Sequence, residues 1–491
     1  MALVHRHMRA APTAARDPHD QPAPLADIPR TLPPAEKPGV VSEDAKAALA
    51  ARCTALRERM AGCAGHELLP DIGALVKSVE WAVCFGEWYA EGDDQKATAI
   101  LAEAERRLAG IDRADWGRAC GAVVRGYRSD IDGSDQPYGL EVPEEAPPER
   151  GYPLYVWLHG RGNNATDMHF IHERMRATAN AASGGRARPT PAGALVLHPF
   201  GRHCVGWKWA GELDVLDAVA HVQAHYNVDP DRIVLAGFSM GGAGAWHIGA
   251  HYPEPWCGVH TGAGFVETKR YNSPFPGPPS PTSAGPGGKP YPAGLATVPW
   301  YEKVLWGLYD VPNYTRSLLN RPLIVYSGQM DAQMQAALVM QEAFEAVDAN
   351  MPHLIGEGMG HAYHPDVAIE VGRRIDRMVA DGLDRLPERS SLQTRTLRYN
   401  TAPRLQLLGL AEHWEDARLD ADFGQAVATV TASPNVLAFA VEGGRRTACF
   451  VVNGLPISPI SNHQPLTFFA RTSASAPFAC VPAPVNNSLE Q

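Results

Sequence analysis

The chain of 491 residues contains no long hydrophobic run. None of its apolar stretches approaches the roughly 18 residues of a transmembrane helix, so we expect no contact with a membrane. The N-terminus carries positive charge but no apolar segment behind it, which is not the pattern of a secretory signal. Basic residues form no long run either, and 44 basic against 54 acidic side chains give a net charge of −10. Since nucleic-acid binding needs a basic face, no nucleic-acid partner is expected.

Motifs for disulfides, metals and nucleotide cofactors are also missing. The eight cysteines are scattered without a CxxC pair, so we interpret them as reduced, mostly buried thiols of a cytoplasmic protein. There is no GxxxxGK[ST] phosphate loop and no convincing dinucleotide fingerprint. His247 and His251 stand at a spacing that metal ligands use, but no third ligand accompanies them, and a packed or solvated helix face is the favoured interpretation. The sequence therefore predicts no cofactor and no metal.

The first part of the chain is rich in Pro and Ala and then becomes helical. Residues 1–40 have few large apolar side chains and are expected to form a disordered tail. Residues 41–117 are expected to form a helical cap, because apolar residues recur there at steps of three and four. Ser42, followed by two acidic residues, has the position of an N-cap. The apolar face of the first expected helix comprises Leu49, Cys53, Leu56, Met60 and Cys63, and two further helices are expected over Ile72–Tyr89 and Gln95–Leu108.

The period of the apolar residues changes beyond residue 118. Ala122–Ser129 and Tyr138–Val142 have the pattern of two strands joined by a turn-rich link. Short apolar runs then alternate with amphipathic segments such as Asp214–Tyr226 and Ala332–Ala349, which indicates parallel βαβ crossovers. Residues 118–390 are therefore expected to form an α/β domain, with a mostly parallel sheet preceded by an antiparallel hairpin. The six runs are Leu154–Leu158, Ala194–His198, Ile233–Ala236, Gly258–Thr261, Leu323–Tyr326 and His353–Ile355.

Two further regions interrupt or follow this pattern. A Pro/Gly-rich insertion over residues 266–298 is too long for an ordinary connection and predicts a lid. Residues 391–491 largely lose the helical pattern, and their short strands predict a C-terminal β-sandwich-like domain. These expected strands are Thr394–Tyr399, Ala426–Thr431, Leu437–Val441 and Ala448–Val452.

The strongest chemical signal is a Gly-x-Ser-x-Gly pentapeptide centred on Ser239. The apolar run Ile233–Ala236 leads into Gly237-Phe-Ser239-Met-Gly241, and a helix rich in small residues follows. A serine on so sharp a strand-to-helix turn crowds its neighbours, so glycine is favoured two positions before and two after it. The helix N-terminus beneath the serine favours developing negative charge. Ser239 is therefore the predicted nucleophile, the alternative being plain Gly-rich packing of strand against helix.

A second glycine-rich turn follows an earlier apolar strand as His159-Gly160-Arg161-Gly162. Glycines there allow a backbone N–H to face a substrate oxygen instead of a neighbouring strand. We expect this loop, at Gly160 and above all at Arg161, to form an oxyanion hole together with the N–H of Met240. The simpler alternative is an ordinary turn at a strand end.

An acid and a histidine complete the set. Asp331 follows the run Leu323–Tyr326, and His361 follows the last apolar run. A serine hydroxyl is a weak nucleophile at neutral pH, so it needs a histidine to accept its proton and a carboxylate to orient that ring. The chain order Ser239, Asp331, His361 is the one expected after a nucleophile elbow. His364 is the competing candidate for the base, and His361 is favoured.

On these residues the chain resembles the α/β-hydrolase superfamily, and within it the prolyl-oligopeptidase-like and esterase-type serine hydrolases. The resemblance covers roughly residues 120–385 and extends to Arg125-Gly-Tyr-Arg and Pro137-Tyr-Gly139-Leu, which are similar to the hairpin of a bacterial multidomain branch labelled as peptidases. Prolyl oligopeptidases carry a large N-terminal β-propeller, whereas helices are expected here, so oligopeptidase activity is not favoured. The resemblance implies Ser239 as nucleophile, His361 as general base, Asp331 as its orienting acid and the Met240 N–H as an oxyanion donor.

Trp207, Trp209 and Glu212 lie in a connection that this fold places at the active-site edge of its sheet. The two indole rings offer stacking for an aryl or sugar group, and Glu212 offers a partner for a cationic group. The alternative, which we favour, is that the rings pack the loop while Lys208 and Glu212 are solvated or paired with each other.

The sequence thus predicts a cytoplasmic serine hydrolase with an α/β-hydrolase fold, an N-terminal helical cap and a C-terminal β-rich domain. It is expected to cleave a carboxylic ester of a small acyl substrate, less readily an amide or thioester, through an acyl-enzyme. The alternatives are an acyltransferase, a lyase or a cyclase with the same triad and, from another class, a catalytically silent binding protein. The sequence leaves open whether the chain forms a homo-oligomer.

Overall fold

The computed structural model describes residues 37, 39–162, 166–176, 188–271, 300–443, 447, 449–459 and 466–483. The expected tail over residues 1–40 and the expected lid over residues 266–298 lie almost entirely outside the described residues. By its contacts the chain divides into two compact units. The helical unit comprises Met1–Val142, Gly162–Ala182 and Phe200–Cys204, and the main unit comprises Pro143–Arg161, Ser183–Pro199 and Val205–Gln491.

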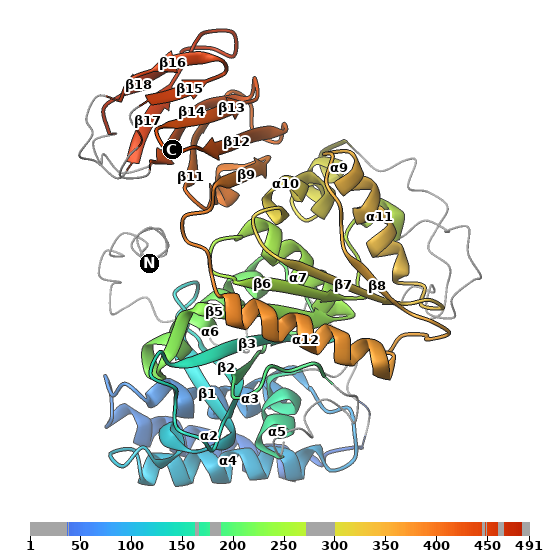
Figure 1. The fold of residues 1–491 in the computed structure, drawn as a ribbon. Helices are drawn as coiled ribbons and strands as arrows, with labels where there is room; N and C mark the ends of the chain where they lie inside the picture. The colour runs from blue at the N-terminus through green and yellow to red at the C-terminus, as the bar shows by residue number, and fades with distance from the viewer. Residues whose placement is uncertain are drawn as a thin grey trace. The chain divides into compact units, whose positions relative to one another are not determined.

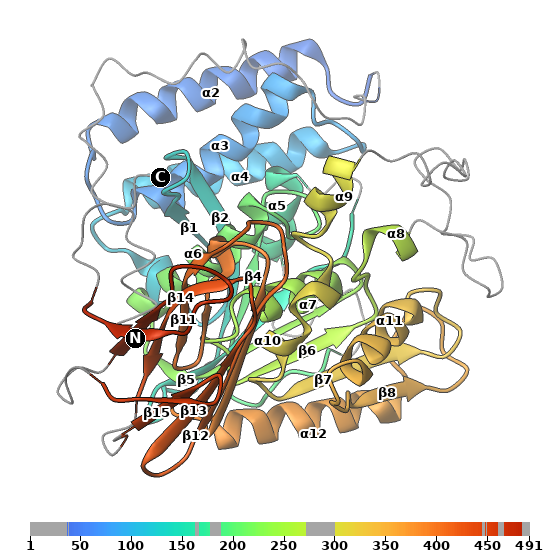
Figure 2. The ribbon, with the colours of Figure 1, turned by 90° about the horizontal axis from the view of Figure 1, so that it is seen from above.

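Three helices of similar length form most of the helical unit: α2 (Glu43–Ala61), α3 (Leu69–Phe85) and α4 (Asp93–Ala109). They lie side by side in Figure 2, and each packs against the other two. The expected N-cap is confirmed, because the Ser42 side chain accepts a hydrogen bond from the Ala45 N–H at 3.2 Å. The buried face of α2 consists of Leu49, Cys53, Leu56 and Met60, as the spacing of these residues predicts.

The antiparallel hairpin also belongs to the helical unit. Its strands β1 (Gly121–Arg128) and β2 (Asp135–Val142) pair directly, and helix α5 (Asp167–Arg176) and the short helix η2 (Asp115–Arg118) complete the unit. Asp71 of α3 connects this helix to β1 and to η2 by hydrogen bonds. Its buried carboxylate accepts hydrogen bonds from Arg125 Nε at 2.9 Å and from Trp116 Nε1 at 2.8 Å. A charge in the interior persists only with such partners, so the hairpin and α3 share one core.

The main unit contains six parallel strands in the order β4-β3-β5-β6-β7-β8. Each strand overlaps one of the six apolar runs, which are nearly continuous because both faces of the sheet are covered. The order reverses at β3, so the chain leaves β3 and β5 in opposite directions. In such sheets ligands bind at the carboxyl ends of the strands where the order reverses. The strands are β3 (Tyr152–Leu158), β4 (Leu195–Pro199), β5 (Val228–Phe238), β6 (Gly258–Gly262), β7 (Leu323–Gly328) and β8 (His353–Gly356).

Helices cover both faces of this sheet (Figure 1). Ile324 packs in a core with residues of α12 (Pro365–Asp381), and Val325 packs in a second core with residues of α7 (Met240–His251) and α11 (Met334–Glu345). Because successive residues of a strand point to opposite faces, α12 lies on one face and α7 and α11 lie on the other. The remaining helices are α6 (Ala210–His225), α8 (Thr268–Tyr271), α9 (Trp300–Trp306), η4 (Val311–Tyr314) and α10 (Thr315–Leu318).

The C-terminal part of the main unit consists of two five-stranded sheets around one apolar core. One sheet has the order β10-β11-β14-β17-β18 and the other β16-β15-β13-β12-β9. Inward and outward residues alternate strictly along β13, as in a two-layer β structure. The strands are β9 (Arg389–Thr394), β10 (Thr401–Ala402), β11 (Leu405–Leu410), β12 (Ala417–Phe423), β13 (Val427–Ala432), β14 (Val436–Glu442), β15 (Cys449–Val452), β16 (Leu455–Ile457), β17 (Leu466–Ala470) and β18 (Ala479–Val481).

One expected strand of this region is wrong. The segment Thr394–Tyr399 is not a strand, because β9 ends at Thr394 and Leu397–Tyr399 form the short 3-10 helix η5. Threonine hydroxyls divert the backbone here: the Thr394 hydroxyl donates to the Thr396 carbonyl at 2.9 Å, and the Thr396 hydroxyl accepts from the Arg398 N–H at 3.2 Å. The turn directs Tyr399 into the interior.

Within the described ranges, no helix combines the length and the apolar character that a membrane crossing requires.

Candidate active site

Ser239 lies on a strained turn between β5 and α7. It is the residue between Phe238, which ends β5, and Met240, which begins α7, and its backbone has φ 62° and ψ −124°. Such a conformation is costly for a residue with a side chain and persists only where its surroundings impose it. Here the Ser239 N–H donates to the Gly262 carbonyl at 2.8 Å, and the Ser239 carbonyl accepts from the Ala243 N–H at 3.0 Å. The side chain remains half-buried at the carboxyl edge of the sheet.

The two glycines of the pentapeptide have no room for a side chain. A Cβ added to Gly237 would lie 2.2 Å from the Gly241 carbonyl oxygen, and one added to Gly241 would lie 1.9 Å from the Leu158 carbonyl oxygen. Both approaches are to backbone atoms, which cannot give way as a flexible side chain does. The close approach of Gly241 also brings the start of α7 against the end of β3.

The structure brings Asp331 and His361 into direct contact. Asp331 stands three residues beyond the end of β7, and His361 stands in the loop after β8. The Nδ1 atom of His361 lies 2.7 Å from Oδ2 of Asp331, whose other carboxylate oxygen accepts from the Gln333 N–H at 2.9 Å. The Asp331 side chain is 4% exposed and that of His361 is 39% exposed. The Asp331 carboxylate is therefore shielded from solvent and accepts two hydrogen bonds, while the His361 ring reaches the surface.

The same imidazole lies beside the nucleophile turn. The centroids of the His361 and Phe238 rings are 4.9 Å apart, and Phe238 immediately precedes Ser239. With Nδ1 donating its proton to Asp331, Nε2 is the unprotonated nitrogen of the neutral ring. The competing histidine, His364, is the N-cap residue before the helix α12, and its backbone N–H donates to the Tyr326 hydroxyl at 2.8 Å. The contact with Asp331 favours His361 as the base.

A buried histidine that the sequence pattern does not single out holds the loop of His361. The side chain of His260 on β6 has no exposed surface, and its Nδ1 bonds to the Ile324 carbonyl at 3.2 Å. A carbonyl only accepts, so Nε2 is left to accept from the Tyr363 hydroxyl at 2.7 Å. Tyr326 of β7 fixes the same loop, since its hydroxyl donates to the Ala362 carbonyl at 2.8 Å.

This arrangement predicts a loss of stability in acid. Burial lowers the pKa of His260 to about 4, whereas an exposed histidine in the unfolded chain titrates near 6.5. The unfolded state therefore binds more protons below about pH 6.5, and the free energy of unfolding falls as the pH drops from there toward 4. Urea unfolding at pH 7, 6 and 5 measures the slope. The His260→Gln variant, which cannot titrate, is expected to show a shallower slope, and equal slopes would contradict the assignment.

The expected oxyanion loop lies against the nucleophile. Gly160 is exposed, and a Cβ added to it would lie 3.7 Å from the Ser239 Cβ. Arg161 follows it and is also exposed. Met240 is the first residue of α7, and the N–H of a first helical residue has no acceptor within its helix. The chain thus holds Gly160, Arg161 and the Met240 N–H around the turn that carries Ser239.

The structure buries two of the three residues named as possible substrate contacts, and for Trp207 this agrees with the favoured alternative that the ring packs the loop. Trp207 is 1% exposed, and its indole N–H donates to the His159 carbonyl at 3.3 Å. Glu212 has no exposed surface, so it does not offer a carboxylate to a cationic substrate. Glu212 is also neither solvated nor paired with Lys208. Trp209 differs from both, since 63% of its surface is exposed.

Glu212 instead joins helices α6 and α7 to the C-terminal part of the chain. Its Oε1 accepts from Nδ1 of His251 at 2.8 Å, and its Oε2 accepts from the hydroxyls of Tyr309 at 2.9 Å and Tyr399 at 3.0 Å. The rings of His251 and Tyr399 stack at 3.6 Å. Burial opposes ionisation, yet His251 and these hydrogen bonds hold the pKa of Glu212 below its usual value. His251 is therefore a buried hydrogen-bond partner of Glu212, while His247 bonds to the Trp207 carbonyl.

Removal of this carboxylate is expected to destabilise the protein strongly. The Glu212→Ala variant leaves His251 and two tyrosine hydroxyls without their acceptor in the interior, and breaking a buried pair in this way costs about 3–5 kcal/mol. The measurement is the free energy of unfolding by urea at pH 7. The Glu412→Ala variant, which removes an exposed carboxylate, is the control and is expected to change stability by less than about 0.5 kcal/mol. A loss below about 1 kcal/mol at Glu212 would contradict a structural role for the network.

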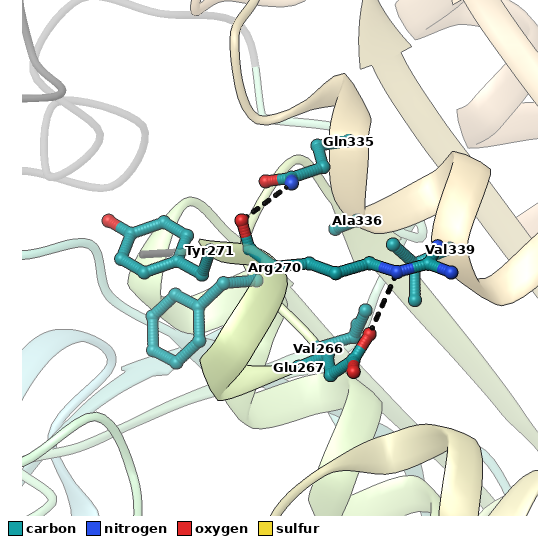
Figure 3. Close-up of a pocket in the computed structure, with 8 residues that line it drawn as sticks. Val266, Glu267, Arg270, Tyr271, Gln335, Ala336 and Val339 are labelled. Atoms are coloured by element: carbon teal, nitrogen blue, oxygen red, sulfur yellow. Dashed lines mark hydrogen bonds and ion pairs between the residues drawn. The ribbon is translucent and has the colours of Figure 1, made fainter. Parts of the chain in front are cut away.

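A small pocket lies beside α8 and α11 (Figure 3). Its volume of about 10 Å³ leaves room for little more than one water molecule. Gln335 donates to the Arg270 carbonyl at 2.8 Å, and Arg270 pairs with Glu267 at 3.2 Å, so these polar groups of the lining satisfy one another. The pocket is too small to hold a substrate. The residues that the structure describes also contain no group of three or more His, Cys, Asp or Glu side chains arranged to hold a metal ion.

The strand order, the turn at Ser239 and the positions of Asp331 and His361 after β7 and β8 define an α/β-hydrolase fold with the layout of a serine hydrolase. A family model described as "Putative esterase" matches residues 217–343. This segment runs from α6 to α11 and includes Ser239 and Asp331. The central part of the chain thus has an α/β-hydrolase fold, and residues 217–343 are similar to an esterase family.

A curated protein that the chain resembles is also described as an esterase. The chain is 32% identical over 208 residues to "Putative esterase NocK" of Nocardia uniformis subsp. tsuyamanensis, a match that covers 39% of this chain and 55% of that protein. The chain thus spans about half the length of the curated relative that it matches.

Solved structures with a similar arrangement are more distant in sequence. An S-formylglutathione hydrolase from Agrobacterium tumefaciens is 17% identical, with a TM-score of 0.36, and the match covers 54% of this chain and 96% of that one. A structure described as a putative dipeptidyl aminopeptidase IV from Bacteroides ovatus is 15% identical, with a TM-score of 0.39, over 53% of this chain and 36% of that one.

Proposed function

We propose that the protein is a serine esterase that cleaves a carboxylic ester of a small molecule through an acyl-enzyme at Ser239. The observation that carries the proposal is the contact of 2.7 Å between His361 and Asp331 beside the strained turn of Ser239. Outside catalysis, such a turn has no evident purpose, since an ordinary backbone joins a strand to a helix at lower energy. The match of residues 217–343 to an esterase family supports the same activity.

In this proposal the reaction begins with transfer of the Ser239 proton to Nε2 of His361 as Oγ attacks the ester carbonyl carbon. Asp331 holds the ring in the required tautomer and stabilises the imidazolium. The Met240 N–H and a backbone N–H of the Gly160–Arg161 loop donate to the oxyanion of the tetrahedral intermediate. His361 then protonates the leaving alcohol, and water activated by the same ring releases the acid.

Covalent labelling tests the proposal. A fluorophosphonate probe, read by intact mass and by peptide mapping, is expected to give a single adduct on the peptide that contains Ser239. Hydrolysis of 4-nitrophenyl esters with short acyl chains is expected to stop as the adduct accumulates. Absence of an adduct in protein shown to be folded by circular dichroism would contradict an activated serine and favour a catalytically silent binding protein.

A second measurement separates hydrolysis from the other uses of this triad. The acyl-enzyme formed from a 4-nitrophenyl ester is offered water alone or water with an added alcohol, amine or thiol. Release of free acid at a rate independent of the acceptor supports the esterase. Transfer of most of the acyl group to the acceptor would favour an acyltransferase.

A further inference from the structure

Lys208 is half-buried, and within the described part of the chain its ammonium group makes neither an ion pair nor a hydrogen bond. Two aromatic rings lie near it instead: Nζ is 5.2 Å from the centroid of Tyr309 and 5.8 Å from that of Phe265. Aromatic faces attract a cation but cannot replace the hydrogen bonds that water supplies. Lys208 is therefore a partly desolvated cation whose ammonium N–H groups have no acceptor among the described residues.

The nearest acidic side chain does not neutralise Lys208 by contact. Asp310 is close enough to act on the ammonium through space, but no ion pair joins them. Its Oδ1 is occupied by Thr268, accepting from the backbone N–H and from the hydroxyl, each at 2.8 Å. Burial lowers the pKa of Lys208, and Asp310 opposes this shift only in part. A bound carboxylate would bring the pKa back up.

The backbone on both sides of Lys208 is held in unfavourable conformations. Trp207 has φ 62°, and Trp209 has φ 51° and ψ −115°. On one side, Nε2 of His247 donates to the Trp207 carbonyl at 2.8 Å. On the other, the Trp209 N–H donates to the Tyr309 hydroxyl at 2.6 Å. Positive φ at two bulky residues costs free energy and concentrates at functional sites, so the anchors fix where Lys208 lies.

The buried Glu212 gives this arrangement its rigidity. The Tyr309 hydroxyl that accepts from Trp209 donates in turn to Glu212. His247 and His251, which bind the Trp207 carbonyl and Glu212, both belong to the helix that begins beside Ser239. The loop of Lys208 is thus fastened to the nucleophile helix on both sides.

Phe265 links Lys208 to the nucleophile turn. Gly264 precedes it, and a Cβ added to Gly264 would lie 3.0 Å from the Ser239 carbonyl oxygen. A Cβ added to Gly206 would lie 3.7 Å from Cζ of Phe265. Gly264 and Phe265 therefore connect the Ser239 turn with the loop of Lys208, and this loop follows β4 at the carboxyl edge of the sheet, where Ser239 follows β5.

We propose that Lys208 binds an anionic group of the substrate, so that the enzyme prefers esters that carry a carboxylate over neutral esters of the same size. The proposal rests on the proposed esterase function and adds the charge of its substrate. It assigns the contact with a charged substrate group to Lys208 and not to Glu212, which has no exposed surface. Glu212 is buried in the interior, whereas Lys208 lies in the loop between β4 and α6.

Two matched pairs of esters test the proposal, because the carboxylate can lie on either side of the scissile bond. The acyl pair is mono-4-nitrophenyl adipate and 4-nitrophenyl hexanoate, and the leaving-group pair is 4-acetoxybenzoate and 4-acetoxybenzamide. The quantity measured is the ratio of kcat/KM for the anionic ester to that for the neutral ester, in the wild type and in Lys208→Met. Lys303→Met, which removes an exposed lysine of the same unit, is the control. The intrinsic reactivities of the esters cancel when the ratio in the variant is compared with the ratio in the wild type.

In at least one pair the Lys208→Met variant is expected to lower the ratio about tenfold or more, as for loss of a charge-assisted hydrogen bond. The loss should lie mainly in KM, and Lys303→Met should leave the ratio unchanged. Unchanged ratios in both pairs for Lys208→Met would overturn the proposal while leaving the esterase intact. Failure of the wild type to hydrolyse any of the esters, together with absence of fluorophosphonate labelling, would instead overturn the esterase function on which it rests.

Discussion

Replacing Ser239 by alanine is expected to lower kcat for ester hydrolysis by about 10⁶-fold, since loss of a triad nucleophile costs this much in serine hydrolases. The substitution removes one oxygen atom and leaves the hydrogen bonds of the turn in place, because those are made by backbone N–H and carbonyl groups. The strained φ of 62° remains, since alanine tolerates it no worse than serine does. The fold should therefore persist while the reaction stops. Residual hydrolysis above the rate in water would come from substrate binding and the oxyanion donors.

The measurement is single-turnover and steady-state hydrolysis of a 4-nitrophenyl ester, with the unfolding midpoint in urea recorded for each variant. Ser475→Ala, at an exposed serine of the C-terminal sheets, is the matched control and is expected to keep full activity. Retention of more than about 1% of the wild-type kcat by Ser239→Ala would refute the role of this residue, because no other serine should replace it.

Replacing Asp331 by asparagine is expected to lower kcat by about 10⁴-fold with little change in KM. The carboxylate accepts the Nδ1 proton of His361 at 2.7 Å and the Gln333 N–H at 2.9 Å. Asparagine has the same shape, but its NH₂ group can turn toward Nδ1 and donate, which places the ring proton on Nε2. That nitrogen can then no longer accept the Ser239 proton, so the nucleophile is not activated.

This variant distinguishes a catalytic acid from a structural one. Because hydroxide at high pH or an external base can take the Ser239 proton in place of the ring, the remaining activity of Asp331→Asn should rise with pH more steeply than that of the wild type. Asp366→Asn, at an exposed position in the first turn of α12, controls for loss of one negative charge in the same region. Equal losses of activity in both variants, or a loss of Asp331→Asn activity that follows unfolding, would count against the triad.

Much of the fold could be predicted from local patterns. Six apolar runs separated by amphipathic segments specify parallel strands and covering helices, because a buried strand must be apolar on both faces. The turn at Ser239 was predictable for a similar reason: Gly237 and Gly241 have backbone atoms within 2.2 Å of any added Cβ, so the packing itself requires the pentapeptide. Asp331 and His361 could be found because each stands just after a strand, where parallel sheets collect their functional side chains.

The roles of the polar residues around the site were decided by the tertiary structure. Three of these residues are neighbours in sequence: Trp207, Lys208 and Glu212. Trp207 and Glu212 are buried, whereas the ammonium group of Lys208 has no acceptor among the described residues. The Glu212 carboxylate faces three hydrogen-bond donors instead of solvent. These donors belong to residues that are distant in the chain, namely His251, Tyr309 and Tyr399.

The sequence by itself thus determined the strand and helix pattern and singled out Ser239, Asp331 and His361 as candidates, because these depend on near neighbours and on a fixed topology. Only the tertiary structure decided that His260 holds the loop of His361 and that Glu212 faces inward. It likewise grouped the antiparallel hairpin with the N-terminal helices, through the buried carboxylate of Asp71. A buried polar group is tolerated only where its partners are in place, and those partners come from segments that no local pattern connects.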